Sequence, residues 1–314
     1  MNLLLMFNMV FLAGAIFTFL MSSFVVGLII KFNRPTISDV SLLLICNTYL
    51  SMIVMSVTLF DFSGHNLYGY FSPTVSFAGQ WCEVRAYVLH GSFCVFYYSF
   101  VLQAVFRLLR VLFYRKKVLH SFGVFLIATV MEWLLGFALV LLNSSSADFV
   151  YHPFDYSCWI TLRNIRGILT VTAYIFVIPL GSIFAFYAII LRHIRRVNGC
   201  QQTKCRQQRA NKRDLIVVKR LVLLLLFLVL IALPSQVVFL VYLVTGHLTP
   251  WFNHIQMTSL SVGVPITAIN LALVTPRVRN TFKRHQQVLP MGGSHKIAPI
   301  SIAVLQLKTR EQVR

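Results

Sequence analysis

Two residues that could do chemistry bracket an uncharged run in the first half of the sequence. Cys82 carries a thiol that can form a disulfide, and Arg107 carries a guanidinium that can form an ion pair. Residues 86–106 between them contain no Asp, Glu, Lys or Arg. In a helix rising about 1.5 Å per residue, the two lie roughly 37 Å apart, slightly more than the roughly 30 Å hydrocarbon core of a bilayer. The spacing predicts that they lie at opposite faces of a membrane.

The composition excludes an ordinary soluble protein. Of 314 residues, 58% are hydrophobic and 11% are charged, whereas soluble domains have about 25% charged residues. The net charge of +20 is of the kind found in nucleic-acid-binding proteins. However, the basic residues lie in short segments between long apolar runs, and no compact basic domain remains. We therefore expect no nucleic-acid partner.

Seven segments have the roughly 20 apolar residues that a helix needs to cross a bilayer. The last uncharged run, residues 221–276, is too long for one crossing, and a turn-rich segment at 245–250 divides it into two. The other five segments lie in residues 1–30, 40–60, 86–106, 118–147 and 167–191. The sequence therefore predicts an all-α integral membrane protein, a seven-transmembrane helix bundle.

The distribution of Lys and Arg predicts the orientation of the bundle. One set of loops holds 25 of the 28 Lys and Arg, and the opposite set holds three. Because cytoplasmic loops are the basic ones, the N-terminus is expected outside and the C-terminus in the cytoplasm of a multi-pass plasma-membrane protein. Residues 1–284 form the expected membrane domain, and 285–314 an expected disordered tail. Residues 277–284 suggest either a short amphipathic helix on anionic lipid or a solvated basic segment.

The cysteines divide by compartment. Cys82 and Cys158 both fall at the predicted outer face, where oxidising conditions permit a disulfide, and we favour that bridge over two free thiols. Asn143 begins the only N-x-S/T sequon on the outer side and is a candidate glycosylation site. Its position at the end of the fourth span counts against modification, because the acceptor lies close to the bilayer.

Polar residues inside spans are functional candidates because they are costly there. Glu132 in the fourth span could serve as an ion or proton site, as a ligand counter-charge or as a structural hydrogen-bonding group, and we favour the last. Pro234 in the sixth span predicts a kink that can act as a hinge. An outward-facing ligand pocket is suggested by polar residues of the third, sixth and seventh spans, of which we favour the first and fourth in this list: His90, Tyr97, Tyr98, Gln236, Tyr242, His254 and Gln256.

Across nearly its whole length the chain resembles the rhodopsin-like (class A) G-protein-coupled receptors, in a divergent form. Residues that match the family's pattern in type and spacing are Cys82, Arg107, Trp133, Cys158, Pro179, Tyr187, Pro234 and Asn270. The resemblance implies that Cys82 bonds to Cys158. It also implies that Arg107, Tyr187, Pro234 and Asn270 belong to the coupling and switching machinery.

The departures from the family concern the switch itself. Phe106 stands where the family has the acid before its arginine, and Leu108 where it has the tyrosine. The helix-six tryptophan and the helix-two aspartate are absent. Asp214, the only acid in a basic loop, stands where family members often place a partner for the arginine. It either locks Arg107 in the resting state or only relieves local charge repulsion.

The function that the resemblance implies is a receptor that binds an extracellular ligand, with a peptide favoured, and activates a heterotrimeric G protein through movement of helix six. Membrane lipids are further expected partners. The alternative is a polytopic channel or transporter, which would normally carry more than one intramembrane charge. We expect no enzymatic activity, and neither catalytic residues, a cofactor nor a metal site.

Overall fold

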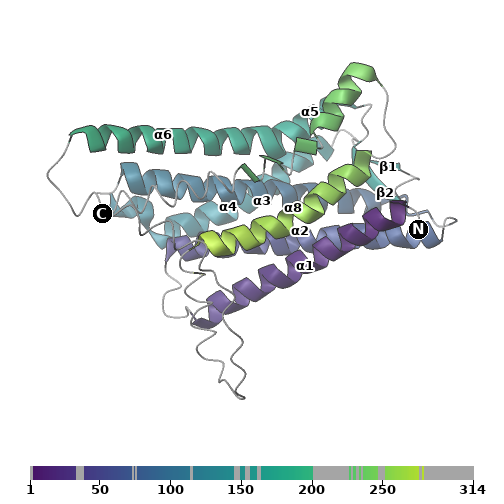
Figure 1. The fold of residues 1–314 in the computed structure, drawn as a ribbon, viewed down its shortest axis with the longest axis horizontal. Coiled ribbons are helices and arrows are strands. Elements are labelled where there is room, and N and C mark those ends of the chain that lie inside the picture. The colour runs from purple at the N-terminus through teal and green to yellow at the C-terminus, as the bar shows by residue number, and fades with distance from the viewer. Residues whose placement is uncertain are drawn as a thin grey trace, which may run out of the picture.

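The computed structural model shows a bundle of long helices with a small hairpin at one end (Figure 1). The described residues are 3–32, 39–72, 74, 76–113, 116–144, 149–152, 156–160, 164–200, 226–227, 229–230, 233–234, 236–246, 252–275 and 278. The long helices are α1 (Leu3–Phe32), α2 (Val40–Phe71), α3 (Gln80–Leu112), α4 (Phe122–Ser144), α6 (Ile178–Cys200) and α8 (Phe252–Val274).

Shorter elements connect the long helices. A 3₁₀ turn (Lys117–His120) precedes α4. The hairpin strands β1 (Phe149–His152) and β2 (Ser157–Ile160) follow α4. Helix α5 (Ile165–Thr172) continues through a π-helical turn (Ala173–Val177) directly into α6.

Six helical segments among the described residues are long and apolar enough to cross a membrane, with α5, the π-helical turn and α6 forming one of them. Helices are expected there because lipid offers no hydrogen bonds to the backbone, and a helix satisfies its own. The chain therefore has the character of a helical multi-pass membrane protein, as the composition predicted. The expected sixth span is described only in pieces, the longest being the apolar helix Gln236–Thr245. Residues 279–314, including the expected tail, lie outside the described part.

Helix α3 is the central element of the bundle. It packs against α2, α4 and α6 and against both hairpin strands, whereas α1 packs against α2 and α8. Its middle turns are buried all round, with Phe96 and Tyr97 among the largest fully buried side chains. An unpaired charge on a helix buried on every side would be costly, which agrees with the absence of charge over residues 86–106.

The hairpin was not predicted by the sequence and modifies the expected all-α description. Strands β1 and β2 pair antiparallel, with Tyr151 opposite Cys158. The hairpin lies at the same end of the bundle as the start of α1, and we call this the hairpin end (Figure 1). Each strand has only four residues, so its stability depends on packing against α3 rather than on the strand pairing alone.

The π-helical turn lies immediately before Pro179 in the fifth span. Proline has no N–H to complete the helical hydrogen-bond ladder, and its ring crowds the preceding turn. A wider turn over Ala173–Val177 accommodates this locally. The irregularity in the fifth span therefore lies just before its proline.

Candidate functional site

A disulfide fixes the hairpin to the first turn of α3. Cys82 and Cys158 are bonded, with their Cα atoms 5.4 Å apart, and both are buried. The bridge predicted from the cysteine positions is thus present. It places β2 over α3, so that neighbouring strand residues can wall cavities on two different sides of that helix.

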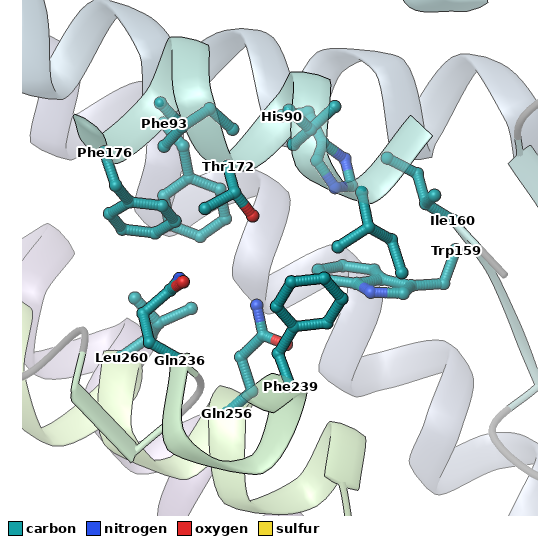
Figure 2. A pocket seen from close by; sticks show the side chains of 13 residues that line it. His90, Phe93, Trp159, Ile160, Thr172, Phe176, Gln236, Phe239, Gln256 and Leu260 are labelled. Atoms are coloured by element: carbon teal, nitrogen blue, oxygen red, sulfur yellow. The ribbon is translucent and has the colours of Figure 1, made fainter. Parts of the chain in front are cut away.

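One of these cavities is the predicted pocket (Figure 2). His90 and Phe93 line it from α3, Gln236 and Phe239 from the helix Gln236–Thr245, and Gln256 from α8. The remaining lining residues are Trp159, Ile160, Ile168, Val171, Thr172, Ile175, Phe176 and Leu260. Gln236 and Gln256 lie across the cavity from His90 and Thr172 (Figure 2). The segments meeting here are therefore far apart in the sequence.

His90 is held in one orientation by its surroundings. Its ring centroid lies 4.7 Å from that of Trp159 and 5.2 Å from that of Phe149. Its Nδ1 lies 2.7 Å from the Ala86 carbonyl oxygen. Because a carbonyl can only accept, Nδ1 carries the proton, and Nε2 of the neutral ring is an acceptor. His90 thus offers the pocket a fixed hydrogen-bond acceptor.

The side chains that line the pocket suit an uncharged ligand group. Its described lining includes no Asp, Glu, Lys or Arg, and the polar groups are an imidazole, two carboxamides, the Thr172 hydroxyl and the indole N–H of Trp159. The remaining walls are aliphatic and aromatic. The cavity measures about 60 Å³, which is space for only a few water molecules. A larger ligand therefore requires the walls to move apart.

The other predicted pocket residues are placed differently. Tyr242 packs beside Phe239, which lines the cavity, but neither Tyr242 nor the two predicted tyrosines of α3 are among the lining residues, so their part in the pocket stays a prediction. His254 lies in α8, but its side chain is outside the described part. Trp159 was missed by the sequence reasoning, because only the hairpin fold brings it beside His90.

Toward the other end of α3, Arg107 lies where α3 packs against α6. Tyr187 of α6 is buried, and Arg107 is near enough for its charge to influence the Tyr187 hydroxyl. Phe106, which stands where the receptors that the chain resembles have an acid, packs edge-on against Phe125 of α4 with ring centroids 5.1 Å apart. Its side chain therefore contributes to the α3–α4 contact rather than to an ion pair with the arginine.

The structure describes only some of the remaining residues that were predicted to act in switching or to be modified. Asp214 lies outside the described residues, so the proposed lock stays a prediction. Pro234 and Asn270 are half-buried in their helical segments. Asn143 lies at the end of α4, and its side chain is outside the described part, as is the rest of the sequon beyond Ser144.

Glu132 lies away from the pocket in a buried polar network. Asn47 Nδ2 of α2 donates to Glu132 Oε2 at 2.9 Å, and Trp133 Nε1 donates to Asn47 Oδ1 at 2.8 Å. Glu132 is only 6% exposed, and its Oε1 has no hydrogen-bond partner among the described residues. This geometry agrees with the structural hydrogen-bonding use favoured from the sequence, because the acid joins α4 to α2.

No protein-family model matches this chain, and no curated protein matches its sequence. The resemblance to the receptor family therefore rests on the residues and spacings described above.

Proposed function

We propose that this chain is a rhodopsin-like G-protein-coupled receptor of the plasma membrane. In this proposal it has seven spans, an extracellular N-terminus and a cytoplasmic C-terminus. It binds an extracellular ligand at the hairpin end and activates a heterotrimeric G protein at the other end. The basic loop at 192–220 and the start of the tail add to the G-protein surface and to contacts with anionic lipids.

The observation that carries the proposal is the placement of two different sites along α3. The pocket around His90 lies near one end, and Arg107 lies near the other. Both sites also involve the fifth span: Phe176 lines the pocket, and Tyr187, eleven residues later, lies near Arg107. A displacement of the pocket walls can thus be transmitted to the Arg107 end through α3 and the fifth span, which pack against each other.

The pocket geometry supports activation by population shift. A ligand shifts a conformational equilibrium only if it binds one state better than the other. A cavity of about 60 Å³ disfavours a larger ligand in the conformation described here, so that ligand would favour a state with separated walls. Gln236 lies two residues after Pro234. A ligand that contacts Gln236 therefore acts beside the proposed hinge of helix six at Pro234.

The lining chemistry narrows what part of the ligand enters the pocket. Leu89 and His90 occupy the region of α3 where amine receptors carry an aspartate, which disfavours a monoamine. The favoured ligand, a peptide, would insert an uncharged side chain or backbone group between His90 and the two glutamines. This agrees with the general pattern of an apolar pocket with a few oriented polar groups.

The proposal is tested by G-protein dissociation in cells that express the full chain. We expect signalling above that of mock-transfected cells, and we expect Arg107→Ala to reduce it at least ten-fold at equal surface expression. Arg110→Ala is the matched control, because Arg110 is exposed on the same helix. Ionic current or substrate flux without coupling to any G protein would instead establish the channel or transporter alternative.

A further inference from the structure

A second cavity lies on the outside of the bundle between α2 and α3, and we call it the α2–α3 groove. Its walls are α2 residues from Val57 to His65 and α3 residues from Trp81 to Leu89, with β2 and the preceding turn as a roof. The members of this set are Val57, Thr58, Asp61, Phe62, His65, Trp81, Cys82, Val84, Arg85, Ala86, Val88, Leu89, Tyr156, Ser157 and Cys158. The groove is distinct from the pocket around His90, because the two use different residues of β2.

The groove opens toward the surroundings of the bundle rather than its core. Trp81 is 76% exposed, Val57 is 50% exposed and Val84 is 46% exposed. Each helix contributes a stretch of eight residues beyond its first lining residue, which corresponds to about 12 Å along the helix axis. Within the predicted spans 40–60 and 86–106 lie the deeper lining residues, from Val57 on α2 and from Ala86 on α3, so this part of the opening is expected to face lipid, whereas Asp61 and Arg85 are expected at the outer membrane surface.

A charged cluster lies at the end of the groove nearest the roof. Arg85 Nε lies 3.5 Å from Asp61 Oδ2, and His65 Nδ1 lies 3.6 Å from Asp61 Oδ1. The carboxylate of Asp61 thus already has Arg85 as a cationic neighbour, whereas Nδ1 of His65 lies closer to the Asp61 backbone carbonyl oxygen, at 2.8 Å. The Arg85 guanidinium is half-exposed and carries five N–H donors, so it has the capacity to bind a second anion beside Asp61.

We propose that the α2–α3 groove binds a long-chain fatty acid from the outer leaflet, with its carboxylate on Arg85 and its chain along the apolar walls. A carboxylate matches the planar fork of a guanidinium. The chain would contact Val57, Val84 and Val88 and remain partly exposed to the bilayer. The site goes beyond the proposed receptor function. Only its assignment to the outer leaflet rests on the proposed orientation.

Charge and volume favour this occupant over other lipids. The groove measures about 360 Å³, near the lower limit of small-molecule sites, which suits one acyl chain better than two. A cationic amphiphile is disfavoured because Asp61, the only acid among the lining residues, is already paired. Glu83, the neighbouring acid on α3, is exposed and does not line the groove.

The test is saturable binding of radiolabelled oleic acid to the full chain in phosphatidylcholine nanodiscs, without any G protein. We expect unlabelled oleic acid to compete and methyl oleate, which lacks the charge, to compete at least ten-fold less well. Arg85→Ala should weaken binding by about ten-fold or more, and Arg85→Lys should restore part of it. Arg166→Ala is the control, because Arg166 is exposed on α5 and lies outside the groove.

Val57→Trp tests the chain-binding part without touching the charged cluster. The larger side chain should fill the groove and abolish saturable binding, while thermal stability of the purified protein reports that it is folded. Equal competition by methyl oleate, or unchanged binding by both Arg85→Ala and Val57→Trp, would overturn the proposal. Since binding is measured without signalling, this result is independent of whether the receptor function holds.

Discussion

Replacing Asn47 by alanine removes the side chain that joins α2 to α4 through two hydrogen bonds. Asn47 donates to Glu132 and accepts from Trp133, and both partners belong to α4. The variant leaves a buried carboxyl group and an indole N–H without this partner. We expect Asn47→Ala to lower the free energy of unfolding while leaving the apolar packing of the two helices largely in place.

The magnitude follows from the number and environment of the lost bonds. Hydrogen bonds between membrane helices contribute about 0.6 kcal/mol each on average and up to about 1.7 kcal/mol. A buried polar group left without a partner costs about 1–3 kcal/mol. For two bonds we expect a loss of about 1–3 kcal/mol. Glu132→Gln retains an oxygen that accepts from Asn47, so we expect a change below about 0.5 kcal/mol.

The assay is unfolding of the purified protein in mixed detergent micelles. Ser56→Ala is the matched control, because Ser56 is buried in α2 but its hydroxyl bonds within its own helix, to the Ile53 carbonyl at 2.8 Å. We expect this control to stay close to the native value. If Asn47→Ala is equally neutral, the network does not hold α2 to α4. If Glu132→Gln is as damaging as Asn47→Ala, the role of Glu132 depends on more than its hydrogen bond.

Two further predictions concern stability. The Cys82–Cys158 disulfide joins residues 76 positions apart, so the double Cys→Ser variant should lose about 4 kcal/mol of stability at 25 °C. A reducing agent should lower the melting temperature of the native protein to that of the variant. An unchanged melting temperature would refute this role of the disulfide. A Cβ at Gly14 would collide with the Ser261 carbonyl of α8, so Gly14→Ala should cost about 1–3 kcal/mol in the same unfolding assay. Gly27→Ala, on the same helix with open space around it, should be neutral or stabilising by up to about 1 kcal/mol, and equal effects of the two would contradict close α1–α8 packing.

The membrane helices were predictable because a charge inside a span is costly, and the charge-free runs therefore mark most of them. The disulfide was predictable for a related reason, since the same runs sort the cysteines by compartment. The hairpin was not, because four-residue strands such as Ser157–Ile160 give little local signal and depend on α3 for packing. The sixth span and the role of Asp214 remain predictions, since they lie partly or wholly outside the described residues.

The pocket was partly predictable. His90 and Gln236 were chosen as polar residues of the third and sixth spans, and both line the cavity. Tyr242 was chosen for the same reason but is not among the lining residues. Six residues of helix place it about 120° around the axis from Gln236, so helical phase distinguishes the two positions. It could not have identified Trp159, whose place beside His90 depends on the fold of the hairpin.

The proposed activation of a G protein at the Arg107 end of α3 can be measured as GDP release from purified heterotrimeric G proteins mixed with the purified chain in nanodiscs. We expect the native chain to accelerate release from at least one G-protein class. Arg107→Ala should lose that acceleration, and Arg110→Ala should retain it. No acceleration from any G-protein class, with or without candidate peptide ligands, or equal acceleration by Arg107→Ala, would contradict this proposal.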